Sequence, residues 1–157
     1  MDLKRPVTPD ITVADAPTAA DLAALRAEGY RALLDLRAPD EPLPAPDRLT
    51  PADEARRAAE LGLRYENIPV LLEEVDDVLI QRVGERIAAV EKPVLVHCAH
   101  GRRAGAMALM HLAVERGLTA QQCLDMAQAM GYDCENQPQL KQLVVAYVER
   151  HSPAHQR

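Results

Sequence analysis

The sequence predicts an α/β fold in which a central, mostly parallel sheet is flanked by helices. Short apolar runs of strand length alternate along the chain with longer segments whose apolar residues recur at helical spacing. The chain has 157 residues, of which 48% are hydrophobic and 27% are charged, so it can bury a core without disulfides. Because the sequence contains no Phe and no Trp, that core must be aliphatic.

The first half of the chain predicts three strands and two helices. Thr18 is a good N-cap and Gly29 a good stop for the first helix, and Pro51 suits the first position of the second. Four prolines between residues 39 and 46 are incompatible with a helix or a central strand and predict a long surface loop. The expected strands are 11–13, 30–36 and 63–70, and the expected helices are 18–28 and 50–61.

The second half predicts one strand and four helices, the last ones covering one face of the sheet. Thr119 and Gln122 form a capping-box pattern at the start of the third of these helices. We expect a single domain spanning 1–157, with its core between about 11 and 150 and short, flexible termini. The expected strand is 93–98, and the expected helices are 75–90, 102–115, 119–131 and 138–150.

Composition limits the partners and the compartment. The formal net charge is −6, which argues against a nucleic-acid partner, so an anionic substrate must meet locally placed positive charge. The longest uncharged apolar stretch, 104–114, is too short to span a bilayer, and the N-terminus lacks a signal-peptide pattern. Three cysteines without paired spacing favour a reducing environment. We therefore expect a cytoplasmic protein with no membrane partner, and we make no prediction of its oligomeric state.

The segment from Val94 to Gly105 carries the chemistry. Cys98 ends an apolar strand, a short loop follows, and a helix then begins. Ligands bind at this edge of open α/β sheets, and the N–H groups at a helix start favour negative charge. The same field stabilises a cysteine thiolate, while Gly101 lets the loop curl around an anion and Arg103 can bind an oxyanion with two N–H groups. These residue types suit nucleophilic attack on a phosphate.

This pattern assigns expected roles to the residues around Cys98 and Arg103. We expect His97 to orient the loop, and Cys123, which lies in an apolar helical pattern, to belong to the core. Whether Cys134 is a resolving thiol for Cys98 stays open. No paired His or Cys spacing predicts a metal, and we expect no cofactor. The expected substrate-binding residues are Ala99, His100, Gly101, Arg102 and Ala104.

The loop resembles the signature of cysteine-dependent protein tyrosine and dual-specificity phosphatases, in which His-Cys precedes a glycine-containing loop and an Arg. Over residues 11–135 the chain is similar to a bacterial branch of that superfamily, the beta-lactamase-hydrolase-like or tyrosine-phosphatase-like proteins. The resemblance implies their fold and the hydrolysis of phosphotyrosine or related phosphate monoesters, from a phosphorylated protein or a small ester, through a cysteinyl phosphate. The segments that carry it are Leu34–Arg37 (LDLR), Tyr65–Val70 (YENIPV), Pro93–Arg103 and Met130–Asp133 (MGYD).

Three departures from the usual pattern concern the chemistry. Four residues, not five, separate Cys98 from Arg103, a tighter ring that also resembles the active loop of rhodanese-type sulfurtransferases. Ala104 stands where a Ser or Thr usually follows the Arg, and Leu72 stands where the dual-specificity pattern has its general acid. We take Glu73 as the candidate acid, with Glu74, Asp76 and Asp40 as alternatives. These departures keep two rival hypotheses open: a persulfide sulfurtransferase and a non-catalytic phosphate-binding module.

Overall fold

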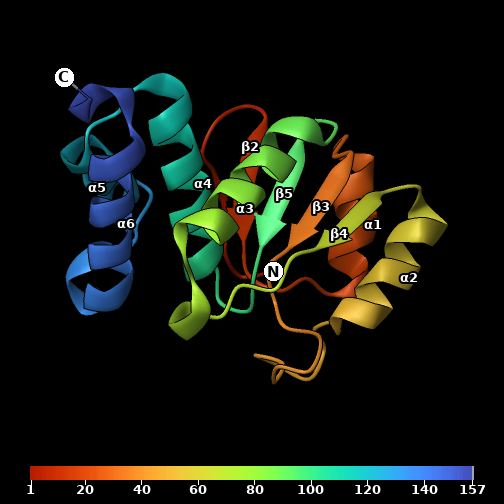
Figure 1. The fold of residues 1–157 in the computed structure, drawn as a ribbon. Coiled ribbons are helices and arrows are strands. Elements are labelled where there is room, and N and C mark those ends of the chain that lie inside the picture. Colours follow the sequence, from red (N-terminus) through yellow and green to blue (C-terminus); the bar gives the residue numbers. More distant parts are fainter. Residues whose placement is uncertain (157) are drawn as a thin grey trace.

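The computed structural model describes residues 1–156 and contains a five-stranded sheet in the order β1-β2-β5-β3-β4 (Figure 1). β1 pairs antiparallel with β2, and all other neighbours are parallel. The α/β class with a mostly parallel central sheet is therefore confirmed. The strands are β1 (Lys4–Pro6), β2 (Ile11–Ala14), β3 (Ala32–Asp35), β4 (Arg64–Asn67) and β5 (Val94–His97).

The register of the sheet places several strand ends at one level. β5 lies between β2 and β3, and His97 at its end is opposite both Ala14 and Asp35. Asp35 is in turn opposite Asn67 of β4. Because parallel strands share a direction, the segments that follow them all emerge at the same edge of the sheet. This edge is where Cys98 lies.

The helices begin where the sequence predicts caps. The side chains of Thr18, Thr50 and Thr119 each accept a hydrogen bond from a backbone N–H in the first helical turn. Asp76, which the sequence offered as a candidate acid, caps another helix in the same way. The α-helices are α1 (Ala19–Ala27), α2 (Pro51–Leu61), α3 (Asp77–Ala89), α4 (Arg102–Arg116), α5 (Ala120–Ala129) and α6 (Pro138–His151), and short 3₁₀ turns are η1 (Leu72–Glu74), η2 (Cys134–Asn136) and η3 (Pro153–His155).

The two faces of the sheet are covered by different helices (Figure 1). Leu33 and Leu95 face one side and pack in a cluster with residues of α1 and α2. Leu34 and Val96 face the other side and pack with α3 and α4. The helices α5 and α6 lie outside α4 and pack against it rather than against the strands. The expectation that the C-terminal helices cover one face is thus wrong for α5 and α6, which form a further layer.

The ends of the chain are more ordered than their composition suggests. Strand β1 was not predicted, because Lys4, Arg5 and Pro6 lack the apolar pattern of a strand and form only an edge of the sheet. Beyond α6, Ser152 is fully buried and donates to the carbonyl of Ala113 at 3.2 Å. His155 accepts a hydrogen bond from the N–H of Ala120 at 3.0 Å. These hydrogen bonds hold Ser152 and His155 against α4 and α5, and the expected flexibility of the termini stays a prediction.

Among residues 1–156, no helix is long and apolar enough to cross a membrane.

Candidate active site

Cys98 lies at the base of a tight loop between β5 and α4. Its side chain is buried, and its Sγ accepts a hydrogen bond from the N–H of Gly101 at 3.1 Å. Gly101 is the N-cap of α4 and has a φ of 91°, a left-handed conformation that side chains rarely adopt. The loop therefore curls back over the sulfur and aims a backbone donor at it, as the sequence predicts.

Arg103 reaches across the same loop and is held by two partners. Its Nη1 donates to Glu41 Oε1 at 3.0 Å and to the carbonyl of Val70 at 2.9 Å. Its Nη2 donates to Glu41 Oε2 at 2.7 Å. A guanidinium has five N–H groups, and these bonds use three of them. The Nε–H and one N–H of Nη2 are left, and together they form a side-on fork that can bind an oxyanion with two hydrogen bonds.

The nearby sulfur of Cys98 contributes to the pKa of this guanidinium. Burial alone would lower the pKa of Arg103, but its hydrogen bonds to Glu41 and the nearby sulfur of Cys98 raise it above the ordinary value. The arginine therefore stays charged and lies next to the sulfur. The sulfur of Cys98, the N–H of Gly101 and the guanidinium of Arg103 thus lie together at the start of α4.

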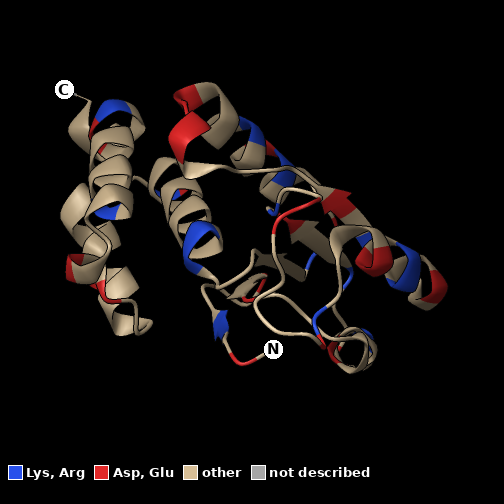
Figure 2. Ribbon diagram, turned by 90° about the horizontal axis from the view of Figure 1, so that it is seen from below, with Lys and Arg blue, Asp and Glu red and all other residues tan. Residues whose placement is uncertain are grey.

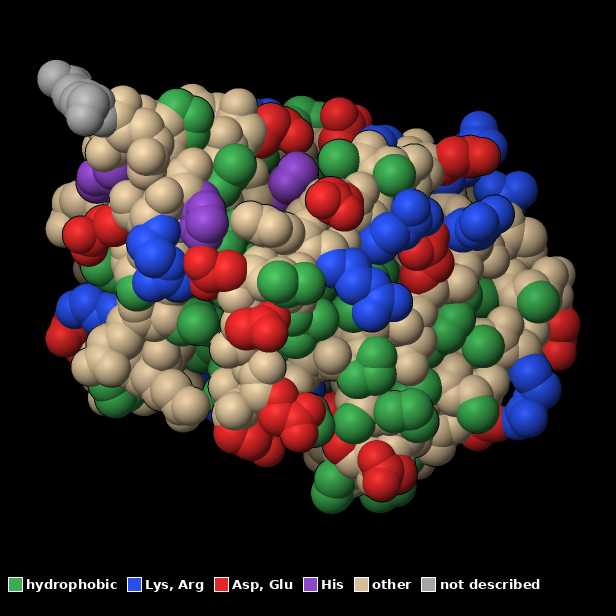
Figure 3. Space-filling model, viewed as in Figure 1, with side chains coloured by type: hydrophobic (Ala, Val, Ile, Leu, Met, Phe, Trp, Pro, Cys, Tyr) green, Lys and Arg blue, Asp and Glu red, His purple; other side chains and the backbone are tan. Residues whose placement is uncertain are grey.

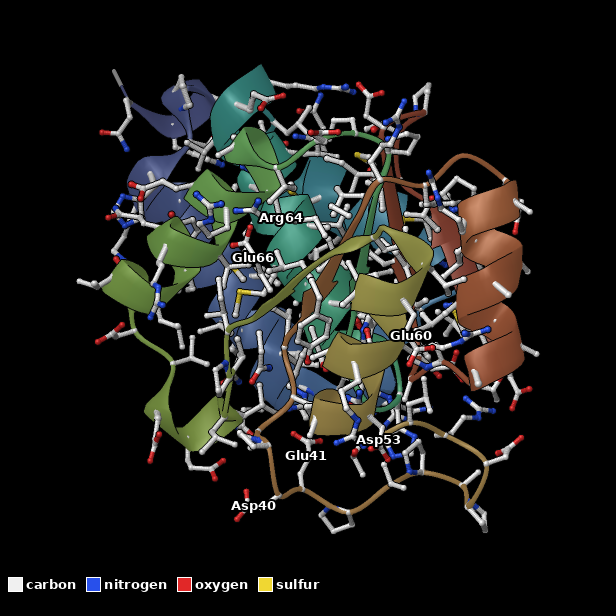
Figure 4. All side chains as sticks on the ribbon, turned by 90° about the vertical axis from the view of Figure 1, so that its right-hand side faces the viewer. Asp40, Glu41, Asp53, Glu60, Arg64 and Glu66 are labelled. Carbon is white, nitrogen blue, oxygen red and sulfur yellow. The ribbon has the colours of Figure 1, made fainter. Side chains whose placement is uncertain are left out.

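Glu41 is the residue that sequence reasoning missed. It lies in the proline-rich loop after β3, where its Oε1 also accepts from the N–H of Ala38 at 2.7 Å. Burial alone would raise the pKa of Glu41, but its bonds to Arg103 and Ala38 hold it below the usual range. Figure 4 shows the neighbouring Asp40 at the outer edge of this loop, away from the body of the protein. The prolines predicted a long surface loop, but nothing local to the sequence distinguished Glu41 from Asp40.

The other candidate acids lie on the segment after β4. Glu73 and Glu74 are exposed on η1, and acidic side chains gather at the lower edge of the face in Figure 3, where η1 lies in Figure 1. Asp76 is engaged as the N-cap of α3, accepting from the N–H of Leu79 at 2.8 Å. Within residues 1–156, no hydrogen bond joins any of these three carboxylates to the loop around Cys98. The structure brings Glu41, and not Glu73, to Arg103.

The remaining loop residues divide into buried and exposed groups. Ala99 and Ala104 are buried, whereas the side chains of His100 and Arg102 are exposed. Figure 2, which views the sheet from the carboxyl ends of its parallel strands, shows basic residues at the first turn of α4. The side chains of His100 and Arg102 therefore form an exposed rim around the loop.

His97, directly before Cys98, belongs to a buried ion-pair network beneath the loop. Its Nε2 lies 2.6 Å from Glu54 Oε2, and its Nδ1, which has no hydrogen-bond partner, lies 3.7 Å from Asp35 Oδ1. Arg37 donates to both carboxylates, at 3.0 Å to Asp35 and 2.9 Å to Glu54. Burial alone would lower the pKa of His97, but the two carboxylates raise it. The ring of His97 thus contacts α2 and β3 and not the loop residues, so its orienting role stays a prediction.

The same network contains three residues whose ligand atoms are spaced closely enough to hold a metal ion: Asp35, Glu54 and His97. One potential ligand atom from each lies within 4.8 Å of the others. The guanidinium of Arg37 already bonds to both carboxylates, so these donors are engaged in the ion-pair network. An added cation would lie next to that guanidinium and be repelled by it.

Tyr132 forms a second contact that the sequence did not predict. Its hydroxyl donates to the carbonyl of Gly101 at 2.9 Å. Gly105 permits this approach, because a Cβ there would lie 2.5 Å from the hydroxyl oxygen. Burial, and then the charge of Cys98, raise the pKa of Tyr132 to about 12, so the phenol keeps its proton. Tyr132 thus braces the loop from the side of α5 and α6.

The other two cysteines lie outside the loop between β5 and α4. Cys123 is fully buried, and burial raises the pKa of its thiol to about 11, as befits a core residue. Cys134 is half-buried on η2. Among residues 1–156 all three cysteines are free thiols.

Comparison with known sequences gives a consistent set of relatives. Residues 2–114 match the family model described as "Beta-lactamase hydrolase-like protein, phosphatase-like domain". A beta-lactamase hydrolase-like protein of Agrobacterium fabrum is 28% identical over 123 residues, which are 78% of this chain and 28% of that protein. One from Xylella fastidiosa is 34% identical over 104 residues, 66% of this chain and 22% of that protein. The matched region is thus about a quarter of the length of these relatives.

Solved structures show the same fold. TpbA of P. aeruginosa, in complex with pTyr, superposes with a TM-score of 0.76 at 21% identity, covering 98% of this chain and 90% of that one. The core catalytic domain of the PP-IP phosphatase SIW14 of S. cerevisiae, in complex with citrate, gives a TM-score of 0.72 at 14% identity, covering 95% and 85%. The expected phosphatase-like fold is therefore confirmed.

Proposed function

Because the chain belongs to the family of beta-lactamase hydrolase-like phosphatase-like domains, we propose that it is a metal-independent cysteine phosphatase acting on phosphotyrosine or related phosphate monoesters. The observation that carries this proposal is the pairing of the buried Cys98 sulfur with the side-on fork of Arg103, which Glu41 and Val70 do not use. The substrate would be a phosphorylated protein or a small phosphate ester. TpbA, whose structure contains pTyr, shares the fold and supports the choice of substrate class.

The reaction would proceed in two displacements. The Cys98 thiolate attacks phosphorus, an S–P bond forms, and the ester P–O bond breaks as the alcohol leaves with a proton. Water then attacks phosphorus, the S–P bond breaks, and phosphate leaves as the thiolate is restored. Arg103 and the amides from Ala99 to Ala104 would stabilise the equatorial oxygens in both steps.

The proton donor for the first step remains a separate proposal. We assign it to Glu73, since η1 follows closely after Val70, whose carbonyl contacts Arg103. General acids of this kind contribute roughly 10²–10⁴-fold in rate. Phenolic esters need this help least, so we expect aryl phosphates to be better substrates than alkyl phosphates.

Hydrolysis of para-nitrophenyl phosphate in the presence of EDTA tests the nucleophile. We expect turnover by the natural chain and a loss of roughly 10³-fold or more in Cys98→Ser, because the weaker nucleophile lacks a base. Equal rates would eliminate Cys98 as the nucleophile.

For the acid, Glu73→Gln should slow hydrolysis of an alkyl phosphate more than hydrolysis of the nitrophenyl ester, and an equal effect on both would reject Glu73.

Sulfur transfer is the second candidate, and the short spacing between Cys98 and Arg103 favours it. The Cys98 thiolate would take the sulfane sulfur of thiosulfate, releasing sulfite, and pass it from the resulting persulfide to an acceptor thiol. Mass measurement of Cys98 after incubation with thiosulfate distinguishes the two reactions. An unmodified thiol together with phosphatase turnover would reject sulfur transfer.

The absence of a Ser or Thr at Ala104 favours a third candidate, a non-catalytic phosphate-binding module. Tight vanadate binding without turnover would support it, whereas a burst of nitrophenol would count against it.

A further inference from the structure

A cavity of about 330 Å³ lies beside the loop, lined by residues of β1, α4, α5, α6 and the segment 131–137. This volume falls within the range of small-molecule pockets. Neither Cys98 nor Arg103 lines the cavity, but His100 and Arg102 at the loop rim do. The cavity is therefore a neighbour of the phosphate-binding position and is separate from it.

The interior of the cavity is apolar and is formed by side chains from three helices. Leu109 comes from α4, Leu124 from α5, and Leu140 and Val144 from α6. The last two are at least 90% buried, so they form a fixed wall. Such a surface binds an aliphatic or aromatic group through burial of apolar area.

The rim of the cavity is positively charged. Arg5, Arg102 and Lys141 line it, and the carboxylate of Asp133 is the acidic group among the lining residues. Lys141 pairs with Glu135, but no ion pair is found for Arg5 or Arg102 within residues 1–156. Figure 2 shows the basic residues of β1 close to those at the first turn of α4. An apolar interior with a cationic rim is complementary to an amphipathic anion.

Tyr132 is a wall shared by the cavity and the loop. Its ring lines the cavity, with the guanidinium carbon of Arg5 4.8 Å from the ring centroid. Its hydroxyl holds the carbonyl of Gly101. A ligand in the cavity would therefore contact a residue that also fixes the loop around Cys98.

We propose that this cavity binds an amphipathic anion, namely a straight acyl or alkyl chain with a carboxylate or phosphate head. The chain would lie among Leu109, Leu124 and Leu140, and the head would meet Arg5 and Arg102 at the rim. This site does not depend on the proposed function, because no part of it uses Cys98.

Isothermal titration of the Cys98→Ser variant with straight-chain carboxylates from butanoate to decanoate, below their micellar range, tests the proposal. Saturating inorganic phosphate is included so that the loop position is filled. We expect one saturable site whose affinity rises about fourfold for each methylene that enters the cavity. Octyl phosphate binding more tightly than nonanoate supports a phosphate head, and the reverse supports a carboxylate head.

Two variants locate the site. Leu124→Trp places an indole in the cavity from a half-buried position and should weaken decanoate binding tenfold or more. Arg102→Ala should weaken it severalfold, while Arg82→Ala, a matched exposed arginine on α3, should not. Circular dichroism confirms that each variant is folded. No binding in the presence of saturating phosphate, affinity that is independent of chain length, or unchanged binding in both Leu124→Trp and Arg102→Ala would overturn the proposal.

Discussion

At the scale of single residues, the hydrogen bonds of Arg103 determine how it can be used. Glu41 and Val70 engage three of its five N–H groups and leave the side-on fork beside Cys98. Under the proposed function, Glu41 would be a positioning residue, because it contacts the guanidinium and not the reacting atoms. The long, flexible arginine side chain would otherwise sample several rotamers.

We expect Glu41→Ala to lower kcat/KM for para-nitrophenyl phosphate by about 10- to 100-fold, because a misplaced guanidinium stabilises the transition state poorly. Glu41→Gln, which keeps the Oε1 acceptor, should recover part of the loss. Asp47→Asn, an exposed carboxylate in the same loop, is the control and should match the natural chain. A Glu41→Ala enzyme of full activity would show that Arg103 orients itself without help.

Sequence alone predicted Cys98, Gly101 and Arg103, because they lie within six positions and their pattern is local. It could not predict Glu41, which is 62 residues from Arg103, or Tyr132, which is 31 residues from Gly101. Both contacts depend on how distant segments pack. From the sequence alone, other carboxylates such as Asp40 and Glu73 were equally good candidates for a place near Arg103. Only the folded loop distinguishes them.

At the scale of elements, one ion-pair cluster joins the start of α3 to the end of α6. Asp77 accepts from Arg150 at 2.6 Å and lies 2.6 Å from Nε2 of His151. These bonds lower the pKa of Asp77 to about 2 from an ordinary 3.8. The cluster stabilises the fold fully above the ordinary value and loses this effect as the pH falls toward 2.

Asp77→Asn should therefore reduce the free energy of unfolding at neutral pH by less than about 1 kcal/mol, since the pair is largely exposed. The difference from the natural chain should shrink as the pH falls from 4 toward 2, measured by urea unfolding at each pH. Asp10→Asn, an exposed carboxylate, serves as control. A difference that stays constant across this range would contradict the assigned ion pairing.

Sequence patterns placed the elements well where local chemistry marks their ends. The capping threonines fixed the starts of α1, α2 and α5, whereas the expected strands 30–36 and 63–70 were longer than β3 and β4. Apolar residues continue beyond each strand because the chain stays buried after its ladder ends, as at Leu36 and Ile68. Hydrophobicity reports burial, and only hydrogen bonding between strands defines their length.

At the scale of the whole molecule, the network of Asp35, Arg37, Glu54 and His97 links the sheet to α2. Tyr65 of β4 adds a hydrogen bond to Asp35 at 2.7 Å, so three strands and a helix meet there. All four charged side chains are buried. A buried network of this kind is sensitive to substitution, because removal of one member leaves the charges of its partners buried without a counter-charge.

Glu54→Ala should lower the free energy of unfolding by about 3–5 kcal/mol, because Arg37 and His97 lose a buried counter-charge. For a chain of this size we expect Tm to fall by roughly 10 °C in differential scanning calorimetry. Glu60→Ala, an exposed glutamate on the same helix, should change Tm little. Equal Tm values for the two variants would show that the network contributes no stability.

The ring of Tyr132 borders both of the proposed binding positions, and this has a spectroscopic consequence. A chain with four tyrosines and no tryptophan gives few aromatic signals, so an isotope-labelled Tyr132 can be resolved by NMR. Oxyanions above Cys98 would perturb its hydroxyl end, and an acyl chain in the neighbouring cavity would perturb its ring protons. One side chain can thus report, in a single titration, whether a compound binds above Cys98 or in the neighbouring cavity.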